Sequence, residues 1–179
     1  MKSLYKYICI IAVIVLVGLI TGCATISPST NTKNSIDSVQ TYGSGFYKSE
    51  KINDFILSDG STYYAHLKPR EHNLLLFWAD WCPHCTSLIE QMSISPNKNE
   101  IADNLVAISE EAEDLAEINK LSPKASSIDR EWRIFDRHDL EHIPALFVVD
   151  GDGKVLGSAE GGEACKELLS KYEANLETN

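Results

Sequence analysis

The sequence predicts an α/β fold in which helices flank a central mixed sheet that is preceded by an N-terminal hairpin. Apolar runs of strand length alternate with segments of helical spacing after residue 73. The last two runs flank the turn "DGDG", which indicates a closing antiparallel hairpin. The chain has 179 residues, of which 44% are hydrophobic and 23% are charged, and this composition is typical of one globular domain.

Residues 1–22 have the layout of an export signal. Lys2 and Lys6 precede an apolar stretch from Ile8 to Ile20 that one glycine interrupts. The stretch is shorter than the roughly 20 residues that a membrane-spanning helix needs. An uncleaved membrane anchor that extends to Ile26 is the alternative.

The end of this signal, "LITGC" (residues 19–23), resembles the lipobox of bacterial lipoproteins. The resemblance implies that residues 1–22 are removed and that Cys23 carries the acyl chains that anchor the protein. We therefore expect an exported lipoprotein that faces the extracytoplasmic side of the cell membrane. A cysteine that lies by chance near an ordinary cleavage site is the alternative.

Residues 23–51 are rich in Ser, Thr, Asn and Gly and predict a flexible tether between the lipidated Cys23 and a folded domain at residues 52–179. Loss of residues 1–22 would make the formal charge of −10 two units more negative, because that segment contains two lysines and no acid. This charge argues against nucleic acid as a partner. It also argues that membrane attachment depends on the lipid anchor rather than on charge.

The first elements of the domain follow from a turn signal and an apolar run. "DFILSDGSTYYAHL" places Asp59 and Gly60 between two short apolar runs, which predicts the hairpin. "NLLLFWA" (residues 73–79) is a continuous apolar run, as expected for a strand buried on both faces. A helix should follow the next few residues, because three apolar residues recur there at helical spacing: Leu88, Ile89 and Met92.

The second half of the domain continues this alternation. Residues 104–109 predict another central strand, and "SEEAEDLAEINKL" predicts a helix with Ser109 as its N-cap. Apolar positions between residues 128 and 135 predict a helix after the polar segment "SPKASS". Residues 145–150 and "KVLGS" predict the closing hairpin, and a final helix begins near Glu163.

The segment "WADWCPHCTSL" (residues 78–88) contains two cysteines that are two residues apart. Three interpretations are open: the pair is a redox centre, it is half of a metal site, or it consists of two buried thiols. The Cys-X-X-Cys spacing can close a short disulfide, and Cys82 falls where helix amides favour a thiolate. Cys85 could then resolve a mixed disulfide formed at Cys82. Pro83 suits the first turn of a helix, and His84 adds a positive charge beside the thiolate when it is protonated.

Other cysteines and tryptophans have simpler interpretations. Cys165 lies on the apolar face of the final helix, which indicates a core residue. We interpret Trp78 and Trp132 as packing residues. Trp81, next to Cys82, is a candidate for the wall of a substrate groove.

"FWADWCPHC" resembles the active-site segment of the thioredoxin superfamily, and "HIPALFVVDGDGKVLG" resembles its cis-proline loop and the hairpin that follows. The N-terminal segment and the long stretch from Ser109 to His142 resemble the TlpA/ResA-like exported branch, whereas Pro-His between the cysteines resembles DsbA-type oxidases. The resemblance implies a thioredoxin-like fold. It also implies that Cys82 attacks, that Cys85 resolves, that Pro144 is cis, and that the backbone of Ile143 pairs with an extended substrate segment.

One position departs from the pattern of the superfamily. Thioredoxins and DsbA-type proteins have a buried acid six residues before the first cysteine, and this chain has Leu76 there. Deprotonation of Cys85 would then depend on water or on another group.

The resemblance implies an enzyme, an exported thiol-disulfide oxidoreductase that exchanges disulfides with protein substrates and with a membrane or extracytoplasmic electron-transfer partner. It would use the Cys82–Cys85 disulfide without a further cofactor, and we expect the oxidising direction. The alternative is a copper-binding or zinc-binding protein in which His142, with His138 in reach, joins the two cysteines.

Overall fold

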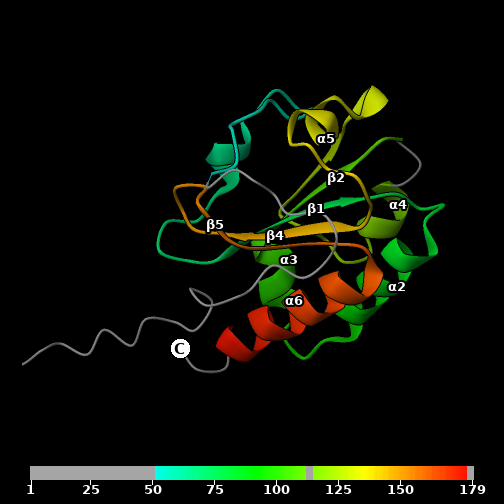
Figure 1. Ribbon diagram of the computed structural model, residues 1–179. Helices are drawn as coiled ribbons and strands as arrows, with labels where there is room; N and C mark the ends of the chain where they lie inside the picture. The colour runs from blue at the N-terminus through cyan, green and yellow to red at the C-terminus, as the bar shows by residue number, and fades with distance from the viewer. Residues whose placement is uncertain (1–50, 112–114, 177–179) are drawn as a thin grey trace, which may run out of the picture. The chain divides into compact units, whose positions relative to one another are not determined.

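The computed structural model describes residues 51–111 and 115–176, and this part of the chain contains a mixed five-stranded sheet (Figure 1). The strand order is β3-β2-β1-β4-β5. Strands β1, β2 and β3 are parallel, whereas β4 is antiparallel to β1 and β5 is antiparallel to β4. The strands span β1 (Asn73–Trp78), β2 (Leu105–Ser109), β3 (Ala125–Ile128), β4 (Ala145–Val149) and β5 (Val155–Glu160).

Helices cover both faces of the sheet, so the predicted fold class is confirmed. In Figure 1, α2 (Pro83–Ile94), α3 (Lys98–Asn104) and α6 (Gly162–Leu176) lie on one side of the sheet, and α5 (Arg133–Arg137) lies with the N-terminal segment on the other. The described part also contains α4 (Leu115–Ile118) and two 3-10 helices, η2 (Tyr63–His66) and η3 (Arg130–Trp132).

Strand β1 is the centre of the core. Leu74 and Leu76 face a hydrophobic cluster with α2 and α6, and Leu75 and Phe77 face a second cluster with the N-terminal segment and α5. All six residues of β1 are buried, which explains why its sequence is an unbroken apolar run from Leu74 onward.

The N-terminal hairpin is less regular than the sequence predicts. Its arms are joined by a single isolated bridge between Ile56 and Thr62. Beyond that bridge the chain enters η2 instead of a strand, because the Thr62 side chain accepts the Ala65 N–H as a helix cap.

The middle of the domain contains the largest differences from the sequence-based expectations. Ser109 is the last, fully buried residue of β2 and not a helix cap, and in the described residues the expected helix is reduced to α4. The last three residues of "SPKASS" do not merely precede a helix: together with Ile128, which was expected in that helix, they form edge strand β3, where Ser127 Oγ accepts the backbone N–H of Ser58. The helix itself begins later, with η3 and α5. Strand β3 was not predicted because a short polar edge strand lacks the apolar periodicity that identifies buried strands. Helix α3 was not predicted from the sequence either.

The signal peptide, the lipidated Cys23 and residues 23–50 of the tether lie outside the described residues, so these assignments stay predictions. Lys51, the last residue of the predicted tether, forms an isolated bridge with Lys154. Within the described part, no helix combines the length and apolar character that crossing a membrane requires.

Candidate active site

The two central cysteines lie at the junction between β1 and α2. Cys82 is the N-cap of α2, and it is joined by a disulfide to Cys85 one turn later, with 5.2 Å between the two Cα atoms. The backbone N–H of Cys85 points at Cys82 Sγ over 3.3 Å. Pro83 occupies the first turn, where its missing N–H removes no intrahelical bond. The sulfur of Cys82 is thus held at the positive end of the helix dipole, which favours a thiolate.

Access to the disulfide is narrow. Cys82 is 5% exposed and Cys85 is fully buried, so only Cys82 retains exposed surface. The exposed fraction of Cys82 is smaller than we expected for the attacking cysteine. Trp81, directly before it, is 62% exposed.

His84 is exposed on the first turn of α2, and its ring lies against the start of α6. A Cβ atom at Gly162 would come within 2.8 Å of His84 Nδ1 and 2.9 Å of His84 Cβ. The absence of a side chain at Gly162 therefore allows this close approach of α2 and α6.

The segment before β4 lies beside the disulfide. The Ile143–Pro144 peptide bond is cis, and the carbonyl oxygen of Ile143 lies 3.8 Å from Cys82 Sγ. The carbonyl oxygen of Pro144 accepts the N–H of Gly161 at 2.8 Å. The structure thus brings Cys82 together with Ile143 and Pro144, which are 61 and 62 residues further along the chain.

Cys165 is fully buried on α6 and has no disulfide partner among the described residues. Its Sγ lies 3.2 Å from the carbonyl oxygen of Pro144 and 3.3 Å from that of Ala159. Burial raises the pKa of this thiol to about 12. Cys165 is therefore a core residue whose sulfur packs against the carbonyl oxygen of Pro144, and its thiol stays protonated at neutral pH.

Leu76 is fully buried on β1, in the same hydrophobic cluster as Cys85. Only two acidic residues are buried in the described part of the chain, Asp129 and Glu160. The carboxylates of both accept backbone N–H groups, Asp129 from the start of α5 and Glu160 from the segment before Pro144.

The residues proposed for a metal site do not converge in the structure. His138 is buried under α5 with Nδ1 2.7 Å from the carbonyl oxygen of Ile134, and His142 Nδ1 lies 3.9 Å from Glu160. No group of three or more His, Cys, Asp or Glu residues is arranged to hold a metal ion within residues 51–111 and 115–176. The geometry of the described part therefore gives the metal-binding alternative no support.

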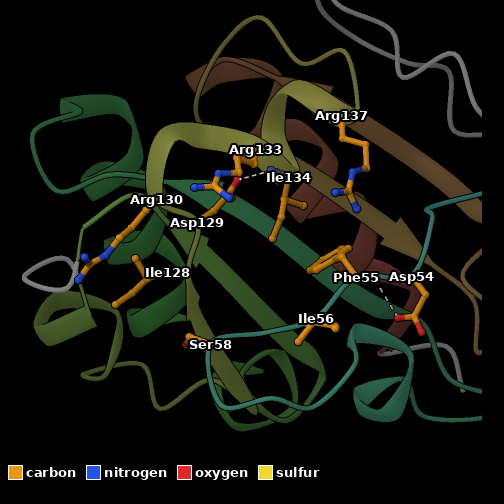
Figure 2. Close-up of a pocket in the computed structure, with 10 residues that line it drawn as sticks. All are labelled: Asp54, Phe55, Ile56, Ser58, Ile128, Asp129, Arg130, Arg133, Ile134 and Arg137. Atoms are coloured by element: carbon orange, nitrogen blue, oxygen red, sulfur yellow. Dashed lines mark hydrogen bonds between the residues drawn. The ribbon is translucent and has the colours of Figure 1, made fainter.

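A pocket of about 720 Å³ lies on the face of the sheet that carries α5. Figure 2 shows it between residues 54–58, the end of β3 and α5, with Arg133 and Arg137 reaching over it. Neither cysteine and neither residue of the Ile143–Pro144 bond lines it. The pocket is therefore separate from the disulfide.

Two residues that contact the segments around the disulfide were not identified from the sequence. Glu160, the last residue of β5, binds the backbone before Pro144, and Gly162 contacts His84. Glu160 stands alone as a charge in an otherwise uncharged strand, which is a weak signal. No local pattern relates either residue to the cysteines, because both contacts arise from folding of distant segments.

Comparisons with known proteins agree with this geometry. A family model described as a thioredoxin-like domain matches residues 65–175. The thiol-disulfide oxidoreductase ResA of Bacillus thuringiensis is 26% identical over 144 residues, which cover 73% of this chain and 83% of that protein. ResA of Bacillus anthracis is 29% identical over 103 residues, which cover 55% of this chain and 59% of that protein.

Two solved structures share the fold. The putative thiol:disulfide interchange protein DsbE of Chlorobium tepidum has a TM-score of 0.55 at 21% identity, and the match covers 74% of this chain and 99% of that one. A thio-disulfide isomerase of Thermus thermophilus has a TM-score of 0.52 at 23% identity, and the match covers 70% of this chain and 94% of that one. Since the family model matches more than half of the residues, this chain belongs to the family of thioredoxin-like domains.

Proposed function

We propose that the protein is a thiol-disulfide oxidoreductase that exchanges disulfides with protein substrates through Cys82 and Cys85. The observation that carries the proposal is a disulfide at the N-terminus of a helix, with its first sulfur beside the cis Ile143–Pro144 bond. The names of the curated relatives, thiol-disulfide oxidoreductases, support the same class of reaction.

In the oxidising direction, a substrate thiolate attacks Cys82 Sγ and breaks the bond to Cys85, which leaves as a thiolate. A mixed disulfide then joins the substrate to Cys82. A second substrate thiolate attacks the substrate sulfur of that mixed disulfide, and Cys82 leaves as a thiolate. The substrate loses two electrons and two protons and gains a disulfide, while the Cys82–Cys85 pair is reduced to the dithiol.

The reduced pair returns its two electrons to a membrane or extracytoplasmic partner, which restores the disulfide. The backbone of Ile143 and the exposed ring of Trp81 form the surface on which an extended substrate segment binds. Cys82 is attacked first, because Cys85 is fully buried behind it.

We test the reaction by trapping. The Cys85→Ser variant, reduced and mixed with a disulfide-bonded peptide, should form a covalent adduct at Cys82 that dithiothreitol releases, because Cys85, the thiol that would resolve it, has been removed. The matched control, Cys82→Ser, should form little adduct, since Cys85 and Cys165 are both fully buried. Equal adduct formation by both variants, or none by either, would contradict the proposal.

We also propose that the protein is exported and anchored by lipid on Cys23, as the "LITGC" motif indicates. In a bacterial host the full chain should be found in the membrane fraction and should incorporate a labelled fatty acid, whereas the Cys23→Ala chain should not incorporate it. A Cys23→Ala chain that is processed and retained in the membrane like the unaltered one would exclude the lipid anchor.

A further inference from the structure

Glu160 is an ionisable residue in a place where a carboxylate needs strong partners. It ends β5, and its side chain is 4% exposed. A buried carboxylate loses its hydration, which is costly unless hydrogen bonds replace the lost water. The partners of Glu160 therefore indicate what it stabilises.

Those partners belong to the segment that precedes the cis bond. Glu160 Oε2 accepts two consecutive backbone N–H groups, those of Glu141 and His142, each at 2.9 Å. Hydrogen bonds to an ionised acceptor are stronger than those between neutral groups. The next residue is Ile143, whose carbonyl oxygen lies 3.8 Å from Cys82 Sγ.

The backbone after Glu160 holds the other end of the same segment. The N–H of Gly161 donates to the carbonyl oxygen of Pro144 at 2.8 Å. Residues 141–144 are thus fixed at one end by the carboxylate of Glu160 and at the other by the backbone of Gly161. Ile143 lies between these two attachments.

The position of Glu160 argues against a role as proton acceptor for Cys85. Glu160 is paired with Ala145 across the β4–β5 ladder, and directly opposite residues project to the same face of a sheet. Ala145 belongs to the core cluster on the α5 side, whereas Cys85 belongs to the cluster on the α2 side.

We propose that Glu160 is a positioning residue, whose carboxylate orders residues 141–143 so that the backbone of Ile143 is ready to pair with the substrate beside Cys82. This inference rests on the proposed function. A loop that is ordered before binding does not lose conformational entropy during binding, so an extended substrate binds more tightly. A small disulfide that makes no backbone pairs should not benefit.

The test compares Glu160→Met and Glu160→Gln in the full chain, with Glu167→Ala as the control. Methionine fills a similar volume but cannot accept the two N–H groups, whereas the amide oxygen of glutamine can. Glu167 is half exposed on α6, where it pairs with Lys171. Exchange is measured with a disulfide-bonded peptide and with 2-hydroxyethyl disulfide, and amide hydrogen exchange is followed at Glu141 and His142.

For Glu160→Met we expect kcat/KM for the peptide to fall about tenfold, mainly through KM, while the rate with 2-hydroxyethyl disulfide stays within about twofold. The amides of Glu141 and His142 should exchange faster. Glu160→Gln and Glu167→Ala should resemble the unaltered protein in all three measurements. If Glu160→Met does not fold, Glu160→Ala replaces it, because water can then reach the two N–H groups.

Three results would overturn the inference. In the first, Glu160→Met loses kcat/KM equally toward the peptide and toward 2-hydroxyethyl disulfide. In the second, Glu160→Met exchanges with the peptide as well as the unaltered protein does, and in the third, Glu160→Gln is as impaired as Glu160→Met. All three require an unaltered protein that is active. If the unaltered protein reacts with neither disulfide, the proposed function itself fails, and the inference about Glu160 fails with it.

Discussion

Cys82 and Cys165 have similarly low exposure, yet their surroundings give them opposite chemistry. Cys82 is the N-cap of a helix, and the N–H of Cys85 points at its sulfur, so that environment favours a thiolate once the disulfide is reduced. Cys165 lies in the core against two carbonyl oxygens, where a negative charge would be unfavourable. Burial alone thus does not determine the reactivity of a cysteine in this protein.

We predict that Cys165 resists alkylation in the folded protein, because a thiol with a pKa near 12 is almost entirely protonated at pH 7 and is also inaccessible. After mild reduction, iodoacetamide should label Cys82 and leave Cys165 unlabelled for hours. Mass spectrometry of the digested protein identifies the labelled sites, and labelling in denaturant is the control. Rapid labelling of Cys165 without denaturant would contradict its assignment to the core.

His84 lies two residues after Cys82, in the first turn of α2. We expect a potential of about −210 mV or higher, compared with about −270 mV for thioredoxin, because groups that stabilise the thiolate also stabilise the reduced form. The His84→Gln variant should have less Cys82 thiolate at pH 6 and a lower potential. Equilibration with glutathione redox buffers measures the potential. A value below about −250 mV for the unaltered protein would instead indicate a reductant.

At the scale of elements, the short helix α5 depends on a residue that precedes it in the chain. Asp129 is 4% exposed, and its Oδ2 accepts the N–H groups of Ile134 at 2.7 Å and of Phe135 at 3.0 Å. Figure 2 shows the bond to Ile134 beside the pocket. Burial raises the pKa of this carboxyl, and the backbone hydrogen bonds oppose that rise. Asp129 satisfies the first amides of a helix whose own N-cap, Trp132, makes no side-chain cap bond.

We therefore predict that Asp129→Ala lowers the free energy of unfolding by about 1–3 kcal/mol, because one buried and one partly buried N–H group lose their acceptor. Asp129→Asn should cost less, since its amide oxygen can accept the same bonds without a buried charge. Denaturant titration of the oxidised protein measures both values. An Asp129→Asn variant that is less stable than Asp129→Ala would show that the charge, and not the acceptor, is required.

At the scale of the whole molecule, His138 connects parts of the second core cluster. Its ring packs against Phe55 of the N-terminal segment and Phe77 of β1, and its Nδ1 contacts the carbonyl oxygen of Ile134 on α5. Burial lowers its pKa from 6.5, and Arg137 adds to this effect. In the native state the imidazole is therefore neutral at pH values where a solvated histidine takes up a proton.

This depressed pKa predicts that part of the stability is lost in mild acid. Below pH 6.5 the unfolded state binds a proton that the folded state excludes, so the free energy of unfolding falls as the pH drops from 6.5 toward the native pKa. Above pH 6.5 this contribution is fully present. The loss is at most about 1.4 kcal/mol per pH unit.

The His138→Phe variant isolates the effect, because it retains an aromatic ring but cannot titrate. Denaturant titrations at pH 7.5 and 5.5 should show a smaller loss of stability for His138→Phe than for the unaltered protein, whatever the variant costs at pH 7.5. The carboxyl groups titrate in both proteins, so the comparison removes their contribution. Equal losses would mean that His138 is not protonated on unfolding in this range.

The sequence determined the elements whose signals are local. Residues 74–79 are apolar without interruption because β1 is buried on both faces, and the apolar face of α6 and the β4–β5 hairpin follow equally regular patterns. The Cys-Pro-His-Cys segment was also readable, since a cap, a helix start and a short disulfide require only neighbouring residues. For the same reason the fold class could be predicted without the structure.

Only the tertiary structure decided the contacts that join distant segments. Edge strand β3 is polar and partly exposed, so its pairing with β2 leaves no apolar period in the sequence. Glu160 contacts the backbone of Glu141 and His142, and Gly162 contacts His84, because the chain between β5 and α6 passes beside these distant segments. No local pattern in the sequence specifies these contacts. A buried carboxylate is tolerated at that site only because two backbone N–H groups converge on it, and this convergence exists only in the folded chain.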